Sequence, residues 1–525
     1  MRRARQLWGL PILLIIGAAS TDVFAQEPAS APEAPAAEAQ DGPHANTEAD
    51  SGENTQEPKE AEKPATPAAA PAPEPAAETA PVASRPKVGD VSVTGYLRGG
   101  FGATLKERVG APDWQSTGGT KKVGGRMTCF ALPNPAGLVS KYRLGNECEV
   151  WSETHFSVVA YANDGVVATV HVMPTVYIPT TYIGYSPTGV TSSPAEYTTS
   201  TGATLSFPNL YVDIKGIPWL GGGTAWLGTR YYKRESVYIS DFFYWNPSGV
   251  GAGIEDIALG KDLRLSYAAF AVDGEPASSG QSGPPLPLQA DLGIRNDVQL
   301  RGIRPYPSGE IQVGFQYIAD DSNHKDANGK SVTHGGWGAT IQHVQKLLGG
   351  DNKLAFQYGR GGGTGFGTLS RFYYPDFSLY FAPSEYRLRL VEVLTVQPLP
   401  YLGAQGAFVF QHDDLGNSGQ KTDWISAGLR AAWGFNRYAK LLGEVGYDYV
   451  KKSNGSDPQL LAKFTIAPAI STGRELMSRP ELRLFYTYAF WNEAARTATV
   501  DSGRLYTSTD LLSGATVGVQ AETWW

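Results

Sequence analysis

The sequence contains few of the residues that metal and redox sites require, and it has no surplus of positive charge. Its 525 residues include two cysteines and seven histidines. Two cysteines without a histidine at zinc-finger spacing cannot complete a zinc site, so we expect no metal and no cofactor. The net charge is −7 at pH 7, and a nucleic-acid-binding surface needs the opposite sign. We therefore expect no nucleic-acid partner.

Long apolar runs are also absent, with one exception at the N-terminus. Three arginines among the first five residues precede the run LWGLPILLIIGAA, and VFA ends at Ala25. This order is typical of a signal peptide over residues 1–25. The alternative is a retained inner-membrane anchor, but the apolar run is short for a helix that spans the membrane. No later stretch reaches the ~20 apolar residues of a transmembrane helix. Cys129 and Cys148 then belong to an exported chain, in which nearby cysteines most often form a disulfide.

Residues 26–84 lack aromatic side chains and are rich in alanine, proline and glutamate. They hold 12 acidic residues and 2 lysines, which leaves residues 85–525 close to neutral. A segment of this composition cannot bury a core, so we expect it to be disordered. It is either a spacer in the periplasm, available to a periplasmic partner, or a solvated tail without one.

From Val91 onward, apolar and polar side chains alternate over segments of about ten residues. In IQVGFQYIA the apolar residues occupy one face and the glutamines the other, and ELRLFYTYAF, KLAFQYG and GEVGYDYV alternate in the same way. A period of two indicates β-strands. Loops rich in Gly, Asn, Asp, Ser and Pro separate these strands, and some are long. Residues 85–525 are therefore predicted to be all-β.

Two all-β architectures fit this pattern, a soluble sandwich and a membrane barrel. Residues 85–525 are many for a single sandwich, and the chain has 27 Tyr, 20 Phe and 12 Trp, often near strand ends, where interfacial girdles need them. A closed barrel is the only sheet that satisfies its backbone in lipid. The last strand, ATVGVQAETWW, alternates to the chain end, with Trp524 on the polar face and Trp525 on the apolar face. We predict a transmembrane antiparallel β-barrel in outer-membrane lipid.

The stretch SKYRLGNECE, followed by VWSETHFSVVAY, combines ionic and aromatic residues at a density unsuited to a soluble core strand. Parity places Trp151 and Glu153 on one face, and Tyr96 and Arg98 share a face in VSVTGYLRGG. In a barrel lumen these side chains suit a saccharide, because aromatic planes stack on the C–H face of a sugar while Arg and Glu bond its hydroxyls. The plainer interpretation is that they are girdle aromatics and wall charges.

Five stretches make the chain resemble the maltoporin (LamB-type) family of outer-membrane sugar porins, which includes sucrose porins. They are GYLRGGFG, SKYRLGNECE, RYYKRESVYISDFFYWNPSGVGAGIE, SRPELRLFYTYA and the terminal WW. The resemblance implies an 18-stranded barrel, within the range of bacterial outer-membrane barrels. It also implies assembly as a homotrimer and a third extracellular loop that folds inward to narrow the pore.

The resemblance assigns roles to individual residues. The aromatic slide of the family falls on Tyr96, Trp151 and Trp524. Its polar track falls on Arg98, Arg143, Glu153, Arg234 and Asp241. Its inward constriction loop includes Phe243, Tyr244, Trp245 and Asn246. Cys129 and Cys148 match the disulfide of the family's first loop.

Several positions depart from the family pattern. Met477 stands where a slide tryptophan precedes SRP, Phe243 replaces the constriction tyrosine, and Asn246 replaces a nearby aspartate. An arginine expected before YVDIKGIPW is missing, slide aromatics of the second and sixth loops have no match, and residues 26–84 are not part of the maltoporin pattern. These departures bear on the preferred solute and not on the architecture.

The sequence thus predicts a signal peptide (1–25), a periplasmic segment (26–84) and an outer-membrane barrel (85–525). We expect a passive, saccharide-preferring channel for maltose, maltodextrins or other oligosaccharides in a Gram-negative outer membrane. A general diffusion porin without a sugar site, or a barrel that only anchors the N-terminal segment, remains an alternative. An outer-membrane enzyme would need a nucleophile, a base and an orienting group. No motif supplies them, so we do not expect an enzyme.

Overall fold

The structure is a computed structural model. It describes residues 86–105, 127–132, 141–179, 197–198, 203–273, 292–319, 324–325, 331–332, 335–366, 384–414, 420–498 and 511–525. The predicted signal peptide (1–25) and acidic segment (26–84) lie outside these described residues.

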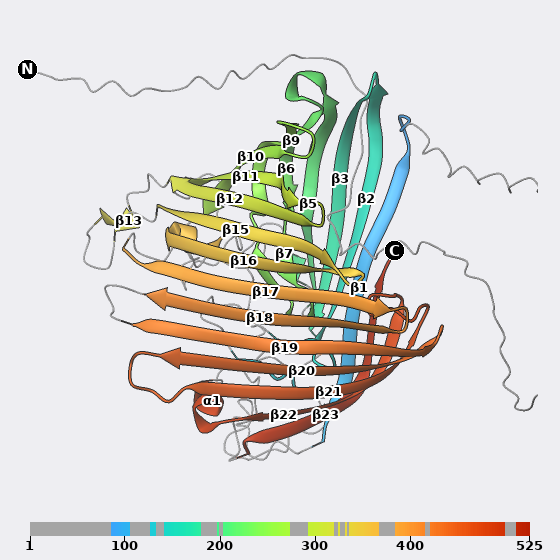
Figure 1. The fold of residues 1–525 in the computed structure, drawn as a ribbon, viewed down its shortest axis with the longest axis vertical. Helices are drawn as coiled ribbons and strands as arrows, with labels where there is room; N and C mark the ends of the chain where they lie inside the picture. Colours follow the sequence, from blue (N-terminus) through green and yellow to red (C-terminus); the bar gives the residue numbers. More distant parts are fainter. Residues whose placement is uncertain are drawn as a thin grey trace, which may run out of the picture. The chain divides into compact units, whose positions relative to one another are not determined.

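The described strands form a closed antiparallel barrel of 18 strands (Figure 1). They are β1 (Val91–Thr104), β2 (Glu149–Asn163), β3 (Val166–Pro179), β5 (Thr204–Ile217), β6 (Gly223–Arg230), β9 (Gly249–Ala258), β10 (Arg264–Asp273), β11 (Leu292–Tyr306), β12 (Gly309–Ala319), β15 (Gly336–Leu347), β16 (Gly350–Gly361), β17 (Tyr386–Leu399), β18 (Leu402–Asp414), β19 (Lys421–Asn436), β20 (Ala439–Lys452), β21 (Gln459–Ser471), β22 (Glu481–Trp491) and β23 (Ser513–Trp524). Strand β1 pairs with both β2 and β23, which closes the ring. The predicted all-β transmembrane barrel is confirmed.

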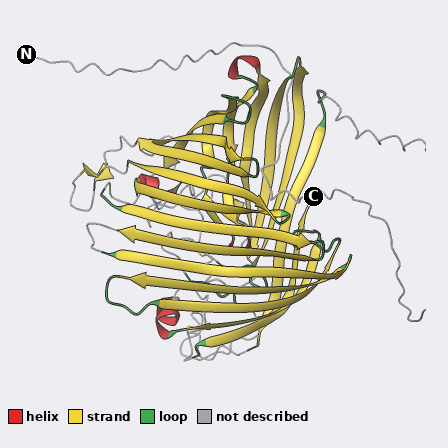
Figure 2. Ribbon diagram, viewed as in Figure 1, coloured by secondary structure: helices red, strands yellow, loops and turns green. Residues whose placement is uncertain are grey.

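Short elements complete the described part, in which strands dominate (Figure 2). The short strands are β4 (Tyr197–Thr198), β7 (Glu235–Val237), β8 (Phe242–Trp245), β13 (His324–Lys325) and β14 (Ser331–Val332). The helical turns are η1 (Pro218–Leu220), η2 (Tyr238–Ser240), η3 (Gly362–Gly365) and α1 (Glu493–Ala498). None of these described helices has the length and apolar character needed to cross a membrane.

The two ends of the barrel differ in the length of their connections. At one end, neighbouring strands are joined by short turns, such as Asp164 and Gly165 between β2 and β3, both with positive φ (49° and 82°). Left-handed pairs of this kind match the twist of a hairpin. At the other end, the connections are longer, with residues 105–148 between β1 and β2 and residues 231–248 between β6 and β9. The two rims are therefore unequal, and the long loops predicted from the sequence lie at one of them.

Side-chain parity separates an apolar outside from a polar inside. On β22, Leu482 and Leu484 are 60% and 55% exposed, whereas Arg483 between them is 2% exposed. The period-two prediction is confirmed here and on β12. Strict alternation along VWSETHFSVVAY would place Ala160 outside with Val150, Phe156 and Val158. That prediction is wrong, because a bulge between Val159 and Tyr161 shifts the register of β2 and Ala160 is buried.

Two long connections enter the barrel and cover part of its inner wall. We call residues 127–132, 141–149 and 231–248 the lumen insert. Its two main segments are joined by backbone bonds, with the Arg143 N–H donating to the Ile239 carbonyl at 2.9 Å. The wall also holds it, because the Lys463 Nζ donates to the Leu144 carbonyl at 2.7 Å and the Ile239 N–H donates to Gln405 at 3.1 Å. With further contacts to Gly314 on β12 and to Thr487 on β22, the insert occupies the lumen side of the strands from β12 to β22.

Candidate functional site: an aromatic row inside the barrel

Four aromatic residues form a row across neighbouring strands at the point where the barrel closes. Tyr96 on β1 pairs directly with Trp524 on β23. Two positions along β1, Arg98 pairs with Trp151 on β2, which in turn pairs with Tyr177 on β3. The Trp151 and Tyr177 rings meet edge to face with centroids 6.2 Å apart. The structure thus brings together the three predicted slide residues and adds Tyr177.

The rings of this row are partly exposed, whereas polar side chains on other wall strands, such as Gln342 on β15 and Thr487 on β22, are buried beneath the lumen insert. Gln342 and Thr487 have no exposed surface, because Gln342 accepts a bond from the Tyr244 hydroxyl at 2.6 Å and Thr487 donates to the Gly145 carbonyl at 3.2 Å. The aromatic row is therefore more exposed than these covered positions of the wall.

A buried carboxylate, Glu522, lies at the centre of the ionic groups beside the row. It accepts hydrogen bonds from Tyr96 (2.8 Å), Arg143 (3.0 Å), Tyr238 (2.5 Å), Arg479 (2.8 Å) and Arg483 (2.6 Å). These donors come from β1, from both parts of the lumen insert, from the β21–β22 turn and from β22. Multiple charge-assisted bonds stabilise a buried carboxylate. Glu522 therefore connects the insert to the barrel wall beside Tyr96 and Trp524.

Arg98 and Asp241, both predicted for the polar track, bind each other. The Arg98 guanidinium lies 2.7 Å from the Asp241 carboxylate and 3.5 Å from Glu149. Asp241 follows η2 with a left-handed φ of 56°. Burial alone would raise the pKa of the Asp241 carboxyl, but the Arg98 and Arg143 guanidiniums outweigh burial and hold the pKa below its usual value. This ion pair fixes the inward loop against β1.

Arg143 and Glu147 are a second buried pair, within the insert itself. The Arg143 Nε donates to the Glu147 carboxylate at 2.5 Å, and the Arg143 Nη2 donates to the Tyr96 hydroxyl at 2.6 Å. Burial would raise the pKa of Glu147, but Arg143, Arg98 and Lys141 together hold it well below the usual range. Three predicted polar-track residues, Arg98, Arg143 and Asp241, thus join in the contacts that hold the insert.

The other two predicted polar-track residues, Glu153 and Arg234, have no ion-pair partner among the described residues. Glu153 accepts a bond from the Trp151 indole N–H at 2.9 Å. The Arg234 guanidinium lies 3.4 Å from the centre of the Tyr231 ring and 4.8 Å from that of Phe243. Both residues are partly exposed, so their charges are available to a solute.

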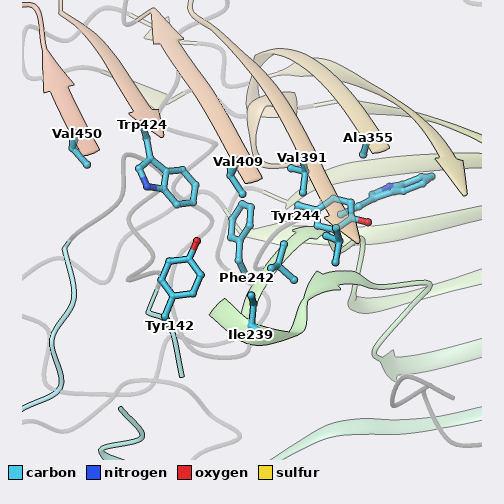
Figure 3. Packing of buried hydrophobic residues seen from close by; sticks show 12 residues of the cluster. Tyr142, Ile239, Phe242, Tyr244, Ala355, Val391, Val409, Trp424 and Val450 are labelled. Carbon is cyan, nitrogen blue, oxygen red and sulfur yellow. The ribbon is translucent and has the colours of Figure 1, made fainter. Parts of the chain in front are cut away.

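The predicted constriction loop has two faces. Phe242 and Tyr244 are buried against Val391, Val409 and other wall residues (Figure 3). Phe243, between them, is partly exposed on the opposite side.

The rest of the predicted loop packs into the wall. The Trp245 ring lies over Gly314 of β12, and the Asn246 N–H donates to the Phe366 carbonyl at 3.2 Å. Both residues are buried. Of the four predicted loop residues, only Phe243 therefore faces the open part of the lumen.

The predicted disulfide is present between Cys129 and Cys148, with Cα atoms 5.9 Å apart. Asn146 supports the same connection: its side-chain oxygen accepts from the Phe130 N–H at 2.8 Å, and its amide donates to the Phe130 carbonyl at 2.8 Å. The bridge therefore joins two strips of the lumen insert.

Two residues show the limits of reasoning from the sequence. Met477 is 9% exposed in an apolar cluster with Leu476 and Phe485, against which Trp524 packs. Tyr177 was not predicted, although His171, Thr175 and Tyr177 share the inner face of β3, so strict parity along VVATVHVMPTVYIP would have identified it.

The fold and this site define a class of protein. A closed barrel with an apolar outside, and with aromatic and ionic groups inside, is an outer-membrane channel. The family model described as LamB porin matches residues 91–525, and the chain belongs to that family.

Solved structures of other outer-membrane proteins are similar at low identity. OmpT of Vibrio cholerae in a trimer form is 8% identical, with 84% of this chain and 100% of that chain covered and a TM-score of 0.36. OccAB1 of Acinetobacter baumannii is 11% identical, with coverages of 83% and 97% and a TM-score of 0.41. OpdK of Pseudomonas aeruginosa, solved with vanillate, is 9% identical, with coverages of 83% and 99% and a TM-score of 0.40.

Proposed function

We propose that this porin is a passive channel that prefers saccharides, with maltose, maltodextrins or other oligosaccharides as solutes. The observation that carries the proposal is the aromatic row Trp524, Tyr96, Trp151 and Tyr177, which stays partly exposed while the lumen insert covers polar side chains of other wall strands. A sugar moving along this row exchanges one ring contact for the next, so it is held without being trapped.

The ionic groups beside the row would serve two different purposes. Arg98, Arg143 and Asp241 are engaged with the insert, and we assign them to holding the constriction. Glu153 and Arg234 have no ion-pair partner within the part of the chain that the structure describes, and we assign them to the solute hydroxyls. A carboxylate accepts from hydroxyls and a guanidinium donates to them, so the two are complementary.

The assembly and its orientation form part of the same proposal. We infer a homotrimer in the outer membrane, with the longer connections outside the cell and the short turns toward the periplasm. Cleavage after Ala25 would leave residues 26–84 in the periplasm, where they are available to a periplasmic partner. The family membership supports this arrangement.

The test is titration of single-channel conductance with maltose, maltohexaose and sucrose, on the natural protein and on Trp151→Ala. Loss of one stacking surface is expected to weaken maltohexaose binding about fivefold, since a ring contact is worth on the order of 1 kcal/mol. Trp433→Ala is the matched control, because Trp433 is 54% exposed on the outer face of β19. Equal affinities for all three proteins would reject the aromatic row as the binding site.

A general diffusion porin without a sugar site is the second candidate, and one observation favours it. Guanidinium groups already lie beside two rings of the row, with Arg479 4.6 Å from the Trp524 ring centre and Arg98 5.9 Å from that of Trp151. A covered ring face cannot stack on a sugar. This candidate predicts that sugars reduce conductance no more than inert polymers of equal size.

A further inference from the structure

Two glycines on neighbouring strands lie directly under the ring of Tyr142. Gly428 on β19 and Gly446 on β20 are cross-strand partners. A Cβ built at either position would lie 2.0 Å from a Tyr142 ring carbon, whereas real Cβ atoms essentially never approach another atom within 3.0 Å. No other amino acid fits at these positions while the Tyr142 ring stays where it is.

Tyr142 belongs to the lumen insert and connects its parts. Its ring is 3% exposed and packs with Phe242 of the inward loop and with Trp424 and Val450 of the wall (Figure 3). Its hydroxyl lies 3.0 Å from the Ser426 hydroxyl. The backbone on both sides of Tyr142 bonds to the inward loop, since Lys141 and Arg143 donate to the Ser240 and Ile239 carbonyls.

We propose that Gly428 and Gly446 form a seat for Tyr142 that positions the whole lumen insert, and thereby sets the width of the pathway beside the aromatic row. The insert is held from two sides of the barrel. On one side Tyr142 packs on the glycines of β19 and β20, and on the other side Asp241 of the insert binds Arg98 of β1. A methyl group in the seat would displace the ring from the wall and move the insert toward the row. The proposal depends on the channel alone, and not on its preference for saccharides.

The experiment compares single-channel conductance in KCl for the mature protein and for Gly446→Ala, Tyr142→Ala and the double variant. We expect Gly446→Ala to lower conductance. We expect no further effect of Gly446→Ala in the Tyr142→Ala background, because the clash then has no partner. Gly443→Ala is the matched control on the same strand, since a Cβ there meets nothing within 4 Å. Tyr142→Phe keeps the ring and is expected to keep natural conductance.

Two results would overturn the proposal: natural conductance in Gly446→Ala, or effects of Gly446→Ala and Tyr142→Ala that add independently. Heat-modifiable migration on gels verifies that each barrel has folded. If Gly446→Ala does not fold, the comparison of Tyr142→Ala with Tyr142→Phe decides the matter. A change of conductance in Tyr142→Ala but not in Tyr142→Phe supports the proposal, and equal conductance of these two variants rejects it.

Discussion

The ionic side chains inside this barrel differ in whether they have an ion-pair partner within the protein. Arg98, Arg143 and Asp241 are used up by contacts that hold the lumen insert, whereas Glu153 and Arg234 have no ion-pair partner in the described part of the chain. Sequence parity placed Arg98 and Glu153 on the lumen side, but it could not reveal this division. Arg98 and Asp241 are 143 residues apart, and their pairing depends on how a loop folds back into the barrel.

Replacing the two unpaired charges should shift ion selectivity in opposite directions. Arg234→Gln removes a lumen cation and is expected to make the channel more cation-selective. Glu153→Gln removes an anion and is expected to make it more anion-selective, because unpaired charges near a constriction attract counter-ions. The reversal potential across a KCl gradient measures both changes. Arg437→Gln, at an exposed turn, is the control, and shifts of the same sign in the two lumen variants would refute the assignment.

Met477 is the position where the family's slide tryptophan is missing, and the natural protein should therefore bind long glucans weakly. Met477 is buried beside Leu476, and a tryptophan there would overpack the cluster at a cost of about 1–3 kcal/mol. We expect its ring to turn toward the lumen near Trp524. Met477→Trp should then raise the affinity for maltohexaose more than that for maltose, as measured by current noise. Equal affinity for maltohexaose in both proteins would count against a slide at this position.

Among the elements, the barrel strands were predictable from alternation, whereas the inward loop was expected only from the family resemblance and its packing on the wall was not predicted. Alternation in β12 and β22 assigned the inner and outer faces because one side of each strand meets lipid. The same alternation gave the wrong face for Ala160, because β2 has a bulge there that the sequence pattern does not reveal. The resemblance assigned Tyr244 and Trp245 to the inward loop, but it did not specify that their side chains pack on the wall. That outcome depends on long-range contacts, which local alternation does not encode.

The inward loop should depend on the Asp241 contact and be insensitive to mild acid. Because the pKa of Asp241 is lowered, the stabilisation by its ion pair is present above the pKa of the unfolded chain and is lost only as the pH falls through the lower folded value. Current noise of the natural channel should therefore stay constant from about pH 7 to about pH 5.

Replacing Asp241 by asparagine should increase the current noise of the channel, whereas mild acid should not. The loss of a charge-assisted bond is expected to cost about 2 kcal/mol of loop anchoring and to increase current noise already at neutral pH. Asp164→Asn is a matched control, because Asp164 also has a positive φ (49°) but lies at a short exposed turn. A quiet Asp241→Asn channel would show that the loop is held by its other contacts.

For the molecule as a whole, closure of the barrel and its family were predictable, whereas its assembly is a proposal. Strand β1 pairs with β23, as the closure of a lipid-embedded barrel requires. We expect the protein extracted from outer membranes to migrate on unheated gels as a trimer and to become monomeric only on boiling. A species of monomer size before boiling would contradict the trimer.

The central claim is that the aromatic row binds saccharides, and titration of the natural channel with maltohexaose in KCl tests it most directly. The account predicts that single-channel conductance falls along a saturation curve to a low residual value, and that maltose requires higher concentrations because it spans fewer rings. A small linear decrease, equal to that caused by an inert polymer of the same size, would contradict the account and leave a general diffusion porin.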